Sequence, residues 1–190
     1  MRIAIDIDST LHHYWDRLSD AALRRFGVEL PYEEQLDWGI TRLRPDQLQL
    51  CIDETHRSEA ILAGEPYPGA VEIVARWRAD GHFIHITGHR DVAARNPTAS
   101  WLQRIGVVYD DLHCSDDKVG RCVELGIELL IDDSPVNLAR AMEHGIHVAT
   151  IAHPWNRDLC EEEDVICAGD WPALSRALDP LLRRHMPVKP

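Results

Sequence analysis

The chain has 190 residues, of which 45% are apolar and 27% are charged, and its formal net charge is −12. This length suits one domain with room for an insertion, and the composition is that of a globular protein with a sizeable core. The acidic balance repels a phosphate backbone, which argues against long nucleic acid as a partner but still allows a small anion at a local site.

The chain opens on "RIAIDID" (2–8), an apolar stretch that predicts a buried strand and ends in two aspartates. Helical patterns follow from residue 12 to residue 65, without a convincing strand. "YWDRLSDAALRRFG" predicts one helix ending at a glycine, and "LPYEEQLDWGI" and "RPDQLQLCIDETHRSEAIL" predict further helices with a proline near each start.

From residue 66 onward, predicted strands and helices alternate. The strands are "HFIHIT", "YDDLHCS", "IELLIDD", "IHVATIA" and, at an edge of the sheet, "EDVICAG". The helices are "AVEIVARWRADG", "NPTASWLQRIG", "DKVGRCVELG", "SPVNLARAMEHG", which Ser134 caps, and "WPALSRALDPLLRR". The final "HMPVKP" is predicted to be a loose tail.

This alternation predicts an α/β fold, a Rossmann-like three-layer sandwich with a central parallel sheet and helices on both faces. The all-helical stretch interrupts the alternation, so we expect it to be an insertion over one end of the sheet. The expected core domain is 1–11 and 66–190, and the expected small helical cap is 12–65.

Five cysteines occur at scattered positions without a CxxC pair, which argues against a disulfide framework or a zinc site and favours a reducing compartment. The histidines at 12, 13, 82, 85 and 89 could suggest a metal site. However, His82 and His85 lie three apart around a strand and point to opposite faces. With no signal peptide pattern and no long apolar run, we expect a cytoplasmic protein without a membrane partner.

Polar residues gather where the predicted strands end, which is where open parallel sheets bind ligands. They are Asp6, Asp8, Thr87, Gly88, Lys118, Asp132 and Asp133. Each alone has an ordinary explanation, since Asp often ends strands or caps helices and most lysines are solvated. Together, close carboxylates would repel one another by several kcal/mol, and a bound cation removes that cost. Ligands that are all oxygen favour Mg²⁺.

This arrangement suits phosphoryl transfer. Asp6 is placed to attack phosphorus and form an aspartyl-phosphate, and Asp8 to give a proton to the leaving alkoxide and later take one from water. The Thr87 hydroxyl, the Gly88 N–H and the Lys118 ammonium suit the non-bridging oxygens. Asp132 is the better direct metal ligand, while Asp133 acts through water or orients Lys118.

These residues resemble the signature of the haloacid dehalogenase superfamily. "DIDSTL" is similar to its first motif, DxDx(T/V)(L/V), Thr87 to the second, Lys118 to the third and "LLIDD" to the fourth. The resemblance covers nearly the whole chain and implies a Rossmannoid fold, Mg²⁺ dependence and an aspartyl-phosphate mechanism. Asp6, the backbone carbonyl of Asp8 and Asp132 are the expected metal ligands, and Asp8 favours a phosphatase over a dehalogenase.

Within the superfamily, the short length, the helical insertion and "LIDDSPVN" resemble the 5'(3')-deoxyribonucleotidases. Two positions depart from that family, since many members carry Gly where this chain has Ser9 and Ser where it has Gly88. The resemblance implies a Mg²⁺-dependent phosphomonoesterase, a 5'-nucleotidase or deoxyribonucleotidase. The alternatives are a phosphatase of sugar phosphates or other small phosphoesters, a non-catalytic ligand-binding or regulatory protein, and a nucleic-acid end-processing enzyme.

The insertion is expected to select the substrate. Its candidate contacts are His12, His13, Tyr14, Trp15, Tyr32 and Trp38. An aromatic ring can stack on a base, although Trp15 and Trp38 would equally suit the core of the insertion. Arg90 could contact a phosphate or sugar, or form an ion pair at the surface. The sequence leaves open which base and which sugar the substrate carries, and whether its phosphate is at the 5' or 3' position. A homodimer is compatible with the sequence.

Overall fold

The computed structural model describes residues 1–115 and 117–184. Six parallel strands form one sheet in the order β3-β2-β1-β4-β5-β6. They are β1 (Arg2–Asp6), β2 (Phe83–Gly88), β3 (Asp111–Cys114), β4 (Leu129–Ile131), β5 (His147–Ile151) and β6 (Val165–Ala168). The strand predicted for an edge, β6, is at an edge.

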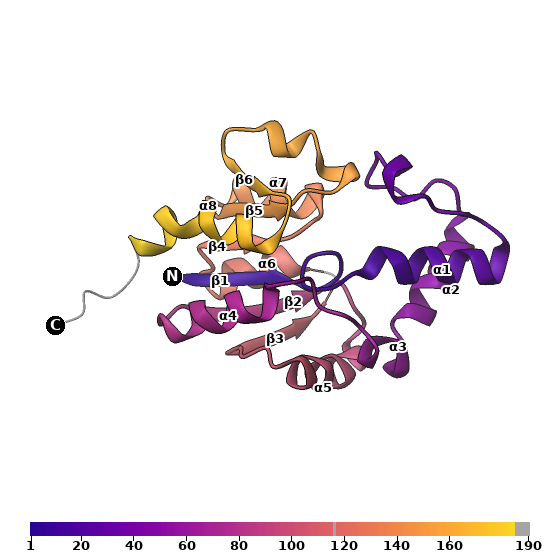
Figure 1. Ribbon diagram of the computed structural model, residues 1–190, viewed down its shortest axis with the longest axis horizontal. Coiled ribbons are helices and arrows are strands. Elements are labelled where there is room, and N and C mark those ends of the chain that lie inside the picture. The colour runs from indigo at the N-terminus through magenta and orange to yellow at the C-terminus, as the bar shows by residue number, and fades with distance from the viewer. Residues whose placement is uncertain (116, 185–190) are drawn as a thin grey trace.

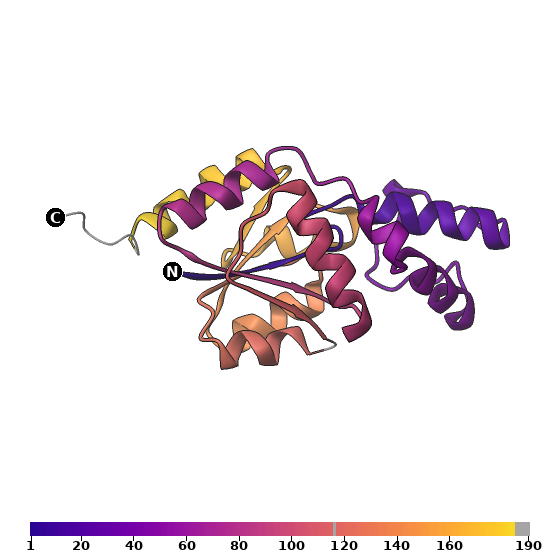
Figure 2. The ribbon, with the colours of Figure 1, turned by 90° about the horizontal axis from the view of Figure 1, so that it is seen from below.

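Helices lie on both faces of the sheet (Figure 2), as predicted. α4 (Ala70–Ala79), α5 (Arg95–Ile105) and α8 (Trp171–Arg183) share one hydrophobic cluster with the sheet, and α6 (Lys118–Glu124) and α7 (Pro135–Glu143) share another. Four short 3₁₀ helices connect other elements: η1 (Tyr32–Glu34), η2 (Val92–Ala94), η3 (Pro154–Asn156) and η4 (Leu159–Glu161). The fold is therefore the predicted Rossmann-like three-layer sandwich.

The central strand β1 is buried on both faces. Ile3 and Ile5 belong to the cluster that contains Trp77 and Trp171, while Ala4 between them belongs to the opposite cluster. This alternation follows from the two-residue period of a strand. A strand covered on both sides needs apolar residues in its interior, and the residues of β1 between Arg2 and Asp6 are accordingly all apolar.

The order of the strands places the ends of β1 and β4 side by side. Residue Ile5 of β1 pairs with Ile131 of β4, and Asp6 pairs with Thr87 of β2. The chain runs outward from β1 to β3 and then returns to β4 on the other side of β1, which makes the β1/β4 junction the topological switch point. Open α/β sheets bind ligands at this kind of junction.

A third group of helices lies beyond the carboxyl ends of the strands (Figure 1). It comprises α1 (Tyr14–Phe26), α2 (Pro45–Thr55) and α3 (Ser58–Leu62), all within residues 12–65. Its apolar side chains form a separate cluster with Trp155 of η3. Trp15, Leu18 and Ala22 of α1 belong to this cluster, as their spacing on one helical face predicts.

The local structure differs from the predictions in two places. The stretch "LPYEEQLDWGI" forms only η1, because Leu36 and Trp38 remain 61% and 46% exposed and thus supply no buried face to stabilise a helix. The first strand ends at Asp6 rather than Asp8, because the Ile7 carbonyl accepts hydrogen bonds from the N–H groups of the following turn.

A disulfide joins Cys160 and Cys167, whose Cα atoms are 5.3 Å apart, and so ties η4 to β6. The scattered spacing of the cysteines argued against disulfides, and this prediction is wrong for Cys160 and Cys167, because the two residues approach only through the connection between β5 and β6. The remaining three cysteines are buried and unpaired. The segment "HMPVKP" lies outside the described residues.

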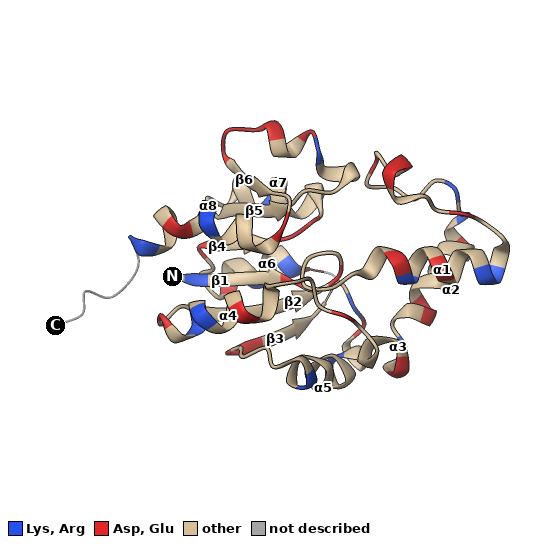
Figure 3. Cartoon of the chain, in the orientation of Figure 1, with Lys and Arg blue, Asp and Glu red and all other residues tan. Residues whose placement is uncertain are grey.

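Lys and Arg are interspersed with Asp and Glu along the helices and loops (Figure 3). Across residues 1–115 and 117–184, the structure contains no helix with the length and apolar character needed to span a bilayer.

Leu130→Ala tests the packing of the β4 layer. Leu130 is fully buried in the cluster of α6 and α7, so we expect the substitution to lower the free energy of unfolding by about 2–5 kcal/mol. Urea denaturation measures this change. The control Val136→Ala, on the exposed side of α7, should stay within about 0.5 kcal/mol. Equal losses for the two variants would contradict the packing described.

Candidate active site

A buried lysine joins two carboxylates at the β1/β4 junction. Asp6 ends β1, Asp132 follows β4, and Lys118 is the first residue of α6. Lys118 Nζ lies 2.7 Å from Asp6 Oδ1 and 2.8 Å from Asp132 Oδ2, and the three side chains are at most 4% exposed. The fold thus brings together residues that are 112 and 14 positions from Lys118 in the sequence.

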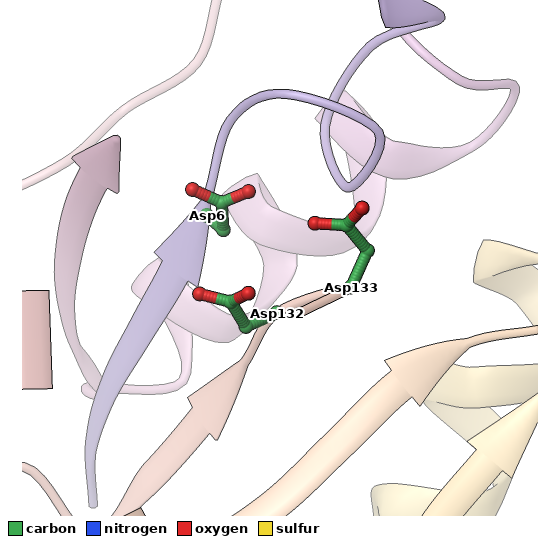
Figure 4. Close-up of side chains that lie close together, drawn as sticks. All are labelled: Asp6, Asp132 and Asp133. Atoms are coloured by element: carbon green, nitrogen blue, oxygen red, sulfur yellow. The ribbon is translucent and has the colours of Figure 1, made fainter. Parts of the chain in front are cut away.

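A third carboxylate, that of Asp133, joins the group. One oxygen from each of Asp6, Asp132 and Asp133 lies within 4.8 Å of the others. Figure 4 shows the carboxylate groups at the ends of β1 and β4, turned toward a common space. Three buried carboxylates face one ammonium, so the group carries an excess of negative charge.

The pKa values reflect this excess. Burial raises the pKa of Asp6 to about 7, with Asp132 and Asp8 adding to the rise and Lys118 opposing it. Burial and the neighbouring Asp6 and Asp132 also hold the pKa of Asp133 well above its usual range. Burial would lower the pKa of Lys118, but the two carboxylates outweigh it and raise that pKa. A divalent cation with oxygen ligands, such as Mg²⁺, fits this donor set and its surplus of charge.

Hydrogen bonds fix the orientation of the two consecutive aspartates. The Ser134 N–H donates to Asp132 Oδ1 at 2.8 Å, and Asn137 Nδ2 donates to both oxygens of the same carboxylate at 3.2 and 3.3 Å. Trp155 Nε1 donates to Asp133 Oδ2 at 3.2 Å. Asp133 was one candidate to orient Lys118, but the ion pairs of Lys118 are with Asp6 and Asp132.

Two of the residues that orient Asp132 and Asp133 were not predicted from the sequence. Asn137 lies in the first turn of α7, directly after the predicted Ser134 cap, so helix geometry could have placed it near Asp132. Trp155 gave no signal, because it is 22 residues from Asp133 and reaches it only through the path of the chain after β5.

Thr87 and Gly88 lie at the end of β2, next to Asp6. Thr87 pairs with Asp6 in the sheet, and its buried Oγ1 has no hydrogen-bond partner among the described residues. A buried unpaired hydroxyl is costly, so it suits a ligand oxygen. A Cβ at Gly88 would stand 3.0 Å from Ile7 Cδ1, so any larger residue here would require the Ile7 side chain to shift.

Asp8 is held in a separate network of positively charged and neutral nitrogen groups. Arg90 Nε lies 2.9 Å from Asp8 Oδ2, and Arg90 Nη2 lies 2.5 Å from Oδ1. His12 Nε2 is 2.8 Å from Oδ1, and His56 Nε2 of the α2 C-terminus is 3.6 Å from Oδ2. Arg90 therefore forms an ion pair, which was one of the two roles predicted for it. The prediction that this ion pair lies at the surface is wrong, because Arg90 is buried.

This network keeps Asp8 ionised. Burial would raise the pKa of Asp8, but the Arg90 guanidinium, the hydrogen bond with His12 and the nearby His56 ring outweigh it and hold that pKa well below the usual range. Arg90 also donates to Thr98 Oγ1 at 3.0 Å. His56, which the sequence reading missed, brings the end of α2 into contact with this carboxylate.

The turn after Asp8 has a strained backbone at one residue. Ser9 has a φ of 59°, in the left-handed region that favours glycine. The N–H groups of Thr10, Leu11 and His12 all point to the Ile7 carbonyl. The turn therefore explains why a glycine suits position 9 in the family that this chain resembles.

The aromatic candidates divide by position. Trp15 is buried in the cluster of residues 12–65, with its ring 5.2 Å from that of Trp155. Trp38 is exposed on the loop after η1. The structure thus brings His12 and Arg90 to Asp8, whereas Trp15 packs and Trp38 stays in solvent.

Paired carboxylates at the switch point, a buried lysine beside them and an unpaired threonine hydroxyl define a phosphoric monoester hydrolase of the haloacid dehalogenase type. A sequence profile of the "5' nucleotidase, deoxy (Pyrimidine), cytosolic type C protein" family matches residues 1–174, and the chain belongs to that family.

One relative has a name that agrees with this family, and two solved structures share the fold. A protein of Chlorobaculum tepidum, provisionally named a 5'(3')-deoxyribonucleotidase, is 28% identical in an alignment of length 176 that covers 84% of this chain and 82% of that protein. A haloacid dehalogenase-like hydrolase from Streptococcus pneumoniae has the same fold, with a TM-score of 0.66, 18% identity and coverage of 97% and 98%. A haloacid dehalogenase family hydrolase from Deinococcus radiodurans, solved with bound phosphate and sodium, has a TM-score of 0.64 at 16% identity. The match covers 96% of this chain and 95% of that chain.

Asp6→Asn tests the electrostatic cost of the carboxylate group. The folded-state pKa of Asp6, about 7, lies above its value of 3.8 in the unfolded chain. An ionised Asp6 therefore destabilises the metal-free protein increasingly as the pH rises from about 4 to about 7. Buried histidines with lowered pKa values act in the opposite direction, so the informative quantity is the difference between variant and wild type.

We expect the free energy of unfolding of Asp6→Asn, minus that of the wild type, to grow by roughly 1–4 kcal/mol between pH 4 and pH 7. Urea denaturation in the presence of a chelator measures it. The control Val136→Ala, an uncharged substitution on the exposed side of α7, should give a difference that does not change with pH. A constant difference for Asp6→Asn would contradict the electrostatics described.

Proposed function

We propose that the protein is a Mg²⁺-dependent 5'-nucleotidase or deoxyribonucleotidase that dephosphorylates nucleoside monophosphates through an aspartyl-phosphate on Asp6. The observation that carries this proposal is the buried group of Asp6, Asp132 and Asp133 around Lys118. Membership of the nucleotidase family and the name of the Chlorobaculum tepidum relative support the substrate class.

The metal ligands in this proposal are Asp6, Asp132 and the backbone carbonyl of Asp8, with Asp133 binding directly or through water. A bound Mg²⁺ would offset the charge of the carboxylates and of the transferring phosphoryl group. The hydrogen bonds from Ser134 and Asn137 keep the Asp132 carboxylate in place before a cation arrives. Such preorganisation lowers the cost of binding.

Asp6 acts as the nucleophile. One of its oxygens forms a bond to phosphorus while the bond from phosphorus to the ester oxygen breaks. Lys118, the Thr87 hydroxyl and the Gly88 N–H bind the non-bridging oxygens as their charge shifts. The unpaired Thr87 Oγ1 supports this role, because a phosphate oxygen would satisfy it.

Asp8 acts as the general acid for the leaving oxygen and then as the base for the water that cleaves the intermediate. Its ion pair with Arg90 keeps it ionised in this structure. The proposed role therefore requires the carboxylate to exchange at least one of its partners for the substrate. A proton on Asp8 becomes favourable when the negative phosphoryl group lies beside it.

Residues 12–65 act as a cap over the site in this proposal, on a core of 1–11 and 66–190. The contact of His56 with Asp8 supports it, because it places the end of α2 against the general acid. In this proposal the partner of the protein is a small phosphomonoester. The proposed location of the protein is the cytoplasm.

The substrate class is tested with a panel of nucleoside monophosphates and sugar phosphates. We expect phosphate release from nucleotides in the presence of Mg²⁺ and its loss on addition of a chelator, measured as inorganic phosphate. Asp6→Asn should abolish turnover, because an amide cannot form the acyl phosphate. Turnover confined to sugar phosphates would overturn the nucleotide assignment, and full activity of Asp6→Asn would overturn the mechanism.

Asp8→Asn tests general acid catalysis through the leaving group. We expect kcat/KM to fall by about 10²–10⁴ for a nucleoside monophosphate, whose alkoxide needs a proton, and by much less for p-nitrophenyl phosphate. The ratio kcat/KM is informative because it excludes hydrolysis of the intermediate, in which Asp8 acts as a base. The exposed control Asp46→Asn should change neither value, and equal losses on the two substrates would contradict the role.

A further inference from the structure

A second concave site lies outside the group of catalytic carboxylates. It is a half-open cavity of about 460 Å³ between the start of α1, the segment before α4, the ends of β5 and β6, and the start of α8. These elements meet near the middle of Figure 1. The volume is in the range of pockets that enclose small ligands, and none of the proposed catalytic or metal-binding residues lines it.

Aromatic rings dominate the wall of this cavity. Trp15 comes from α1, Tyr32 from η1, Tyr67 from the segment before α4, and Trp171 from α8. Tyr32 and Tyr67 are partly exposed, whereas Trp15 and Trp171 are buried, so the two tyrosines offer most of the surface on which a planar aromatic ligand could stack.

The charges around the cavity select against a phosphate. Asp16 and Asp170 line it, and the wall includes no Lys or Arg among the described residues. The positive ends of α1 and α8 do not compensate, because Asp16 lies in the first turn of α1 and Asp170 caps α8 through the Ala173 N–H. In keeping with this negative environment, burial and nearby carboxylates raise the pKa of Tyr32 to about 12, so its hydroxyl remains a donor.

Two side chains of the wall hold the turn that follows Asp8. His153 Nε2 lies 2.8 Å from the Ser9 carbonyl, and Trp171 Nε1 donates to the Thr10 carbonyl at 2.8 Å. A carbonyl only accepts, so His153 Nε2 carries the hydrogen and Nδ1 accepts from the Tyr32 hydroxyl at 2.7 Å. A ligand that displaces either ring would therefore shift the backbone next to the proposed general acid.

We propose that this cavity is an effector site for a planar aromatic molecule without negative charge, and that its natural occupant is the nucleoside product. The choice of the nucleoside as the occupant rests on the proposed function. The proposal that the cavity binds a planar aromatic molecule does not depend on that function. A nucleoside keeps the planar base and has lost the phosphate that Asp16 and Asp170 repel. Its binding would move the Ser9–Thr10 turn and slow the enzyme, as feedback from the product.

The test measures inhibition of p-nitrophenyl phosphate hydrolysis by nucleosides, in wild type and in Ala152→Leu. Ala152 lines the cavity with an exposed side chain, so leucine fills the space without crowding the core. We expect nucleosides to lower kcat without raising KM, and Ala152→Leu to raise the inhibition constant at least tenfold. The control Ser100→Leu, exposed on α5, should be inhibited like the wild type.

Competitive inhibition, or equal inhibition of Ala152→Leu and wild type, would overturn the effector site. The substrate p-nitrophenyl phosphate keeps this result separate from the nucleotide assignment. If no phosphoester is hydrolysed, a nucleoside titration monitored by the fluorescence of the lining Trp15 and Trp171 addresses the same cavity. Binding that is at least tenfold weaker in Ala152→Leu supports the site, and equal or absent binding in both proteins overturns it.

Discussion

The site depends on one electrostatic constraint: three buried carboxylates lie together at the junction of β1 and β4, and the Lys118 ammonium pairs with two of them. The parallel sheet creates this constraint, because Asp6 ends β1 and Asp132 directly follows the adjacent strand β4. Lys118 offsets part of the repulsion, and burial with the remaining negative charge raises the pKa of Asp6. The fold alone leaves this charge uncompensated, and a divalent cation is the ligand that would balance it.

Two contact paths connect this group to the helices of residues 12–65. In one, Trp155 donates to Asp133 and packs against Trp15 of α1. In the other, His56 at the end of α2 meets the Asp8 carboxylate beside Arg90. Any movement of these helices would therefore change the surroundings of both a proposed metal ligand and the proposed general acid. If residues 12–65 form the proposed cap, these packed side chains would connect it to the proposed catalytic residues.

The sequence predicted the fold and the members of the carboxylate group because both follow from local patterns. Buried strands read as apolar runs, and their carboxyl ends must meet at one edge of a parallel sheet. The partners of these residues were not predictable in the same way. Trp155 reaches Asp133 through an irregular segment, and the burial of Arg90 depends on the charge of Asp8 and on Thr98. The helix predicted around Trp38 does not form for a similar reason. Helical spacing of apolar residues in the sequence does not reveal whether other parts of the chain will pack against that face.

The proposed function presupposes that the carboxylate group holds one divalent cation. Calorimetric titration of the metal-free protein with Mg²⁺ tests this most directly, in wild type and in Asp132→Asn. The substitution keeps the size of the side chain and removes one negative charge from the group. We expect a single site in the wild type and at least a tenfold loss of affinity in the variant. Equal affinity in both proteins, or no Mg²⁺ binding in the wild type, would contradict the central role of this group.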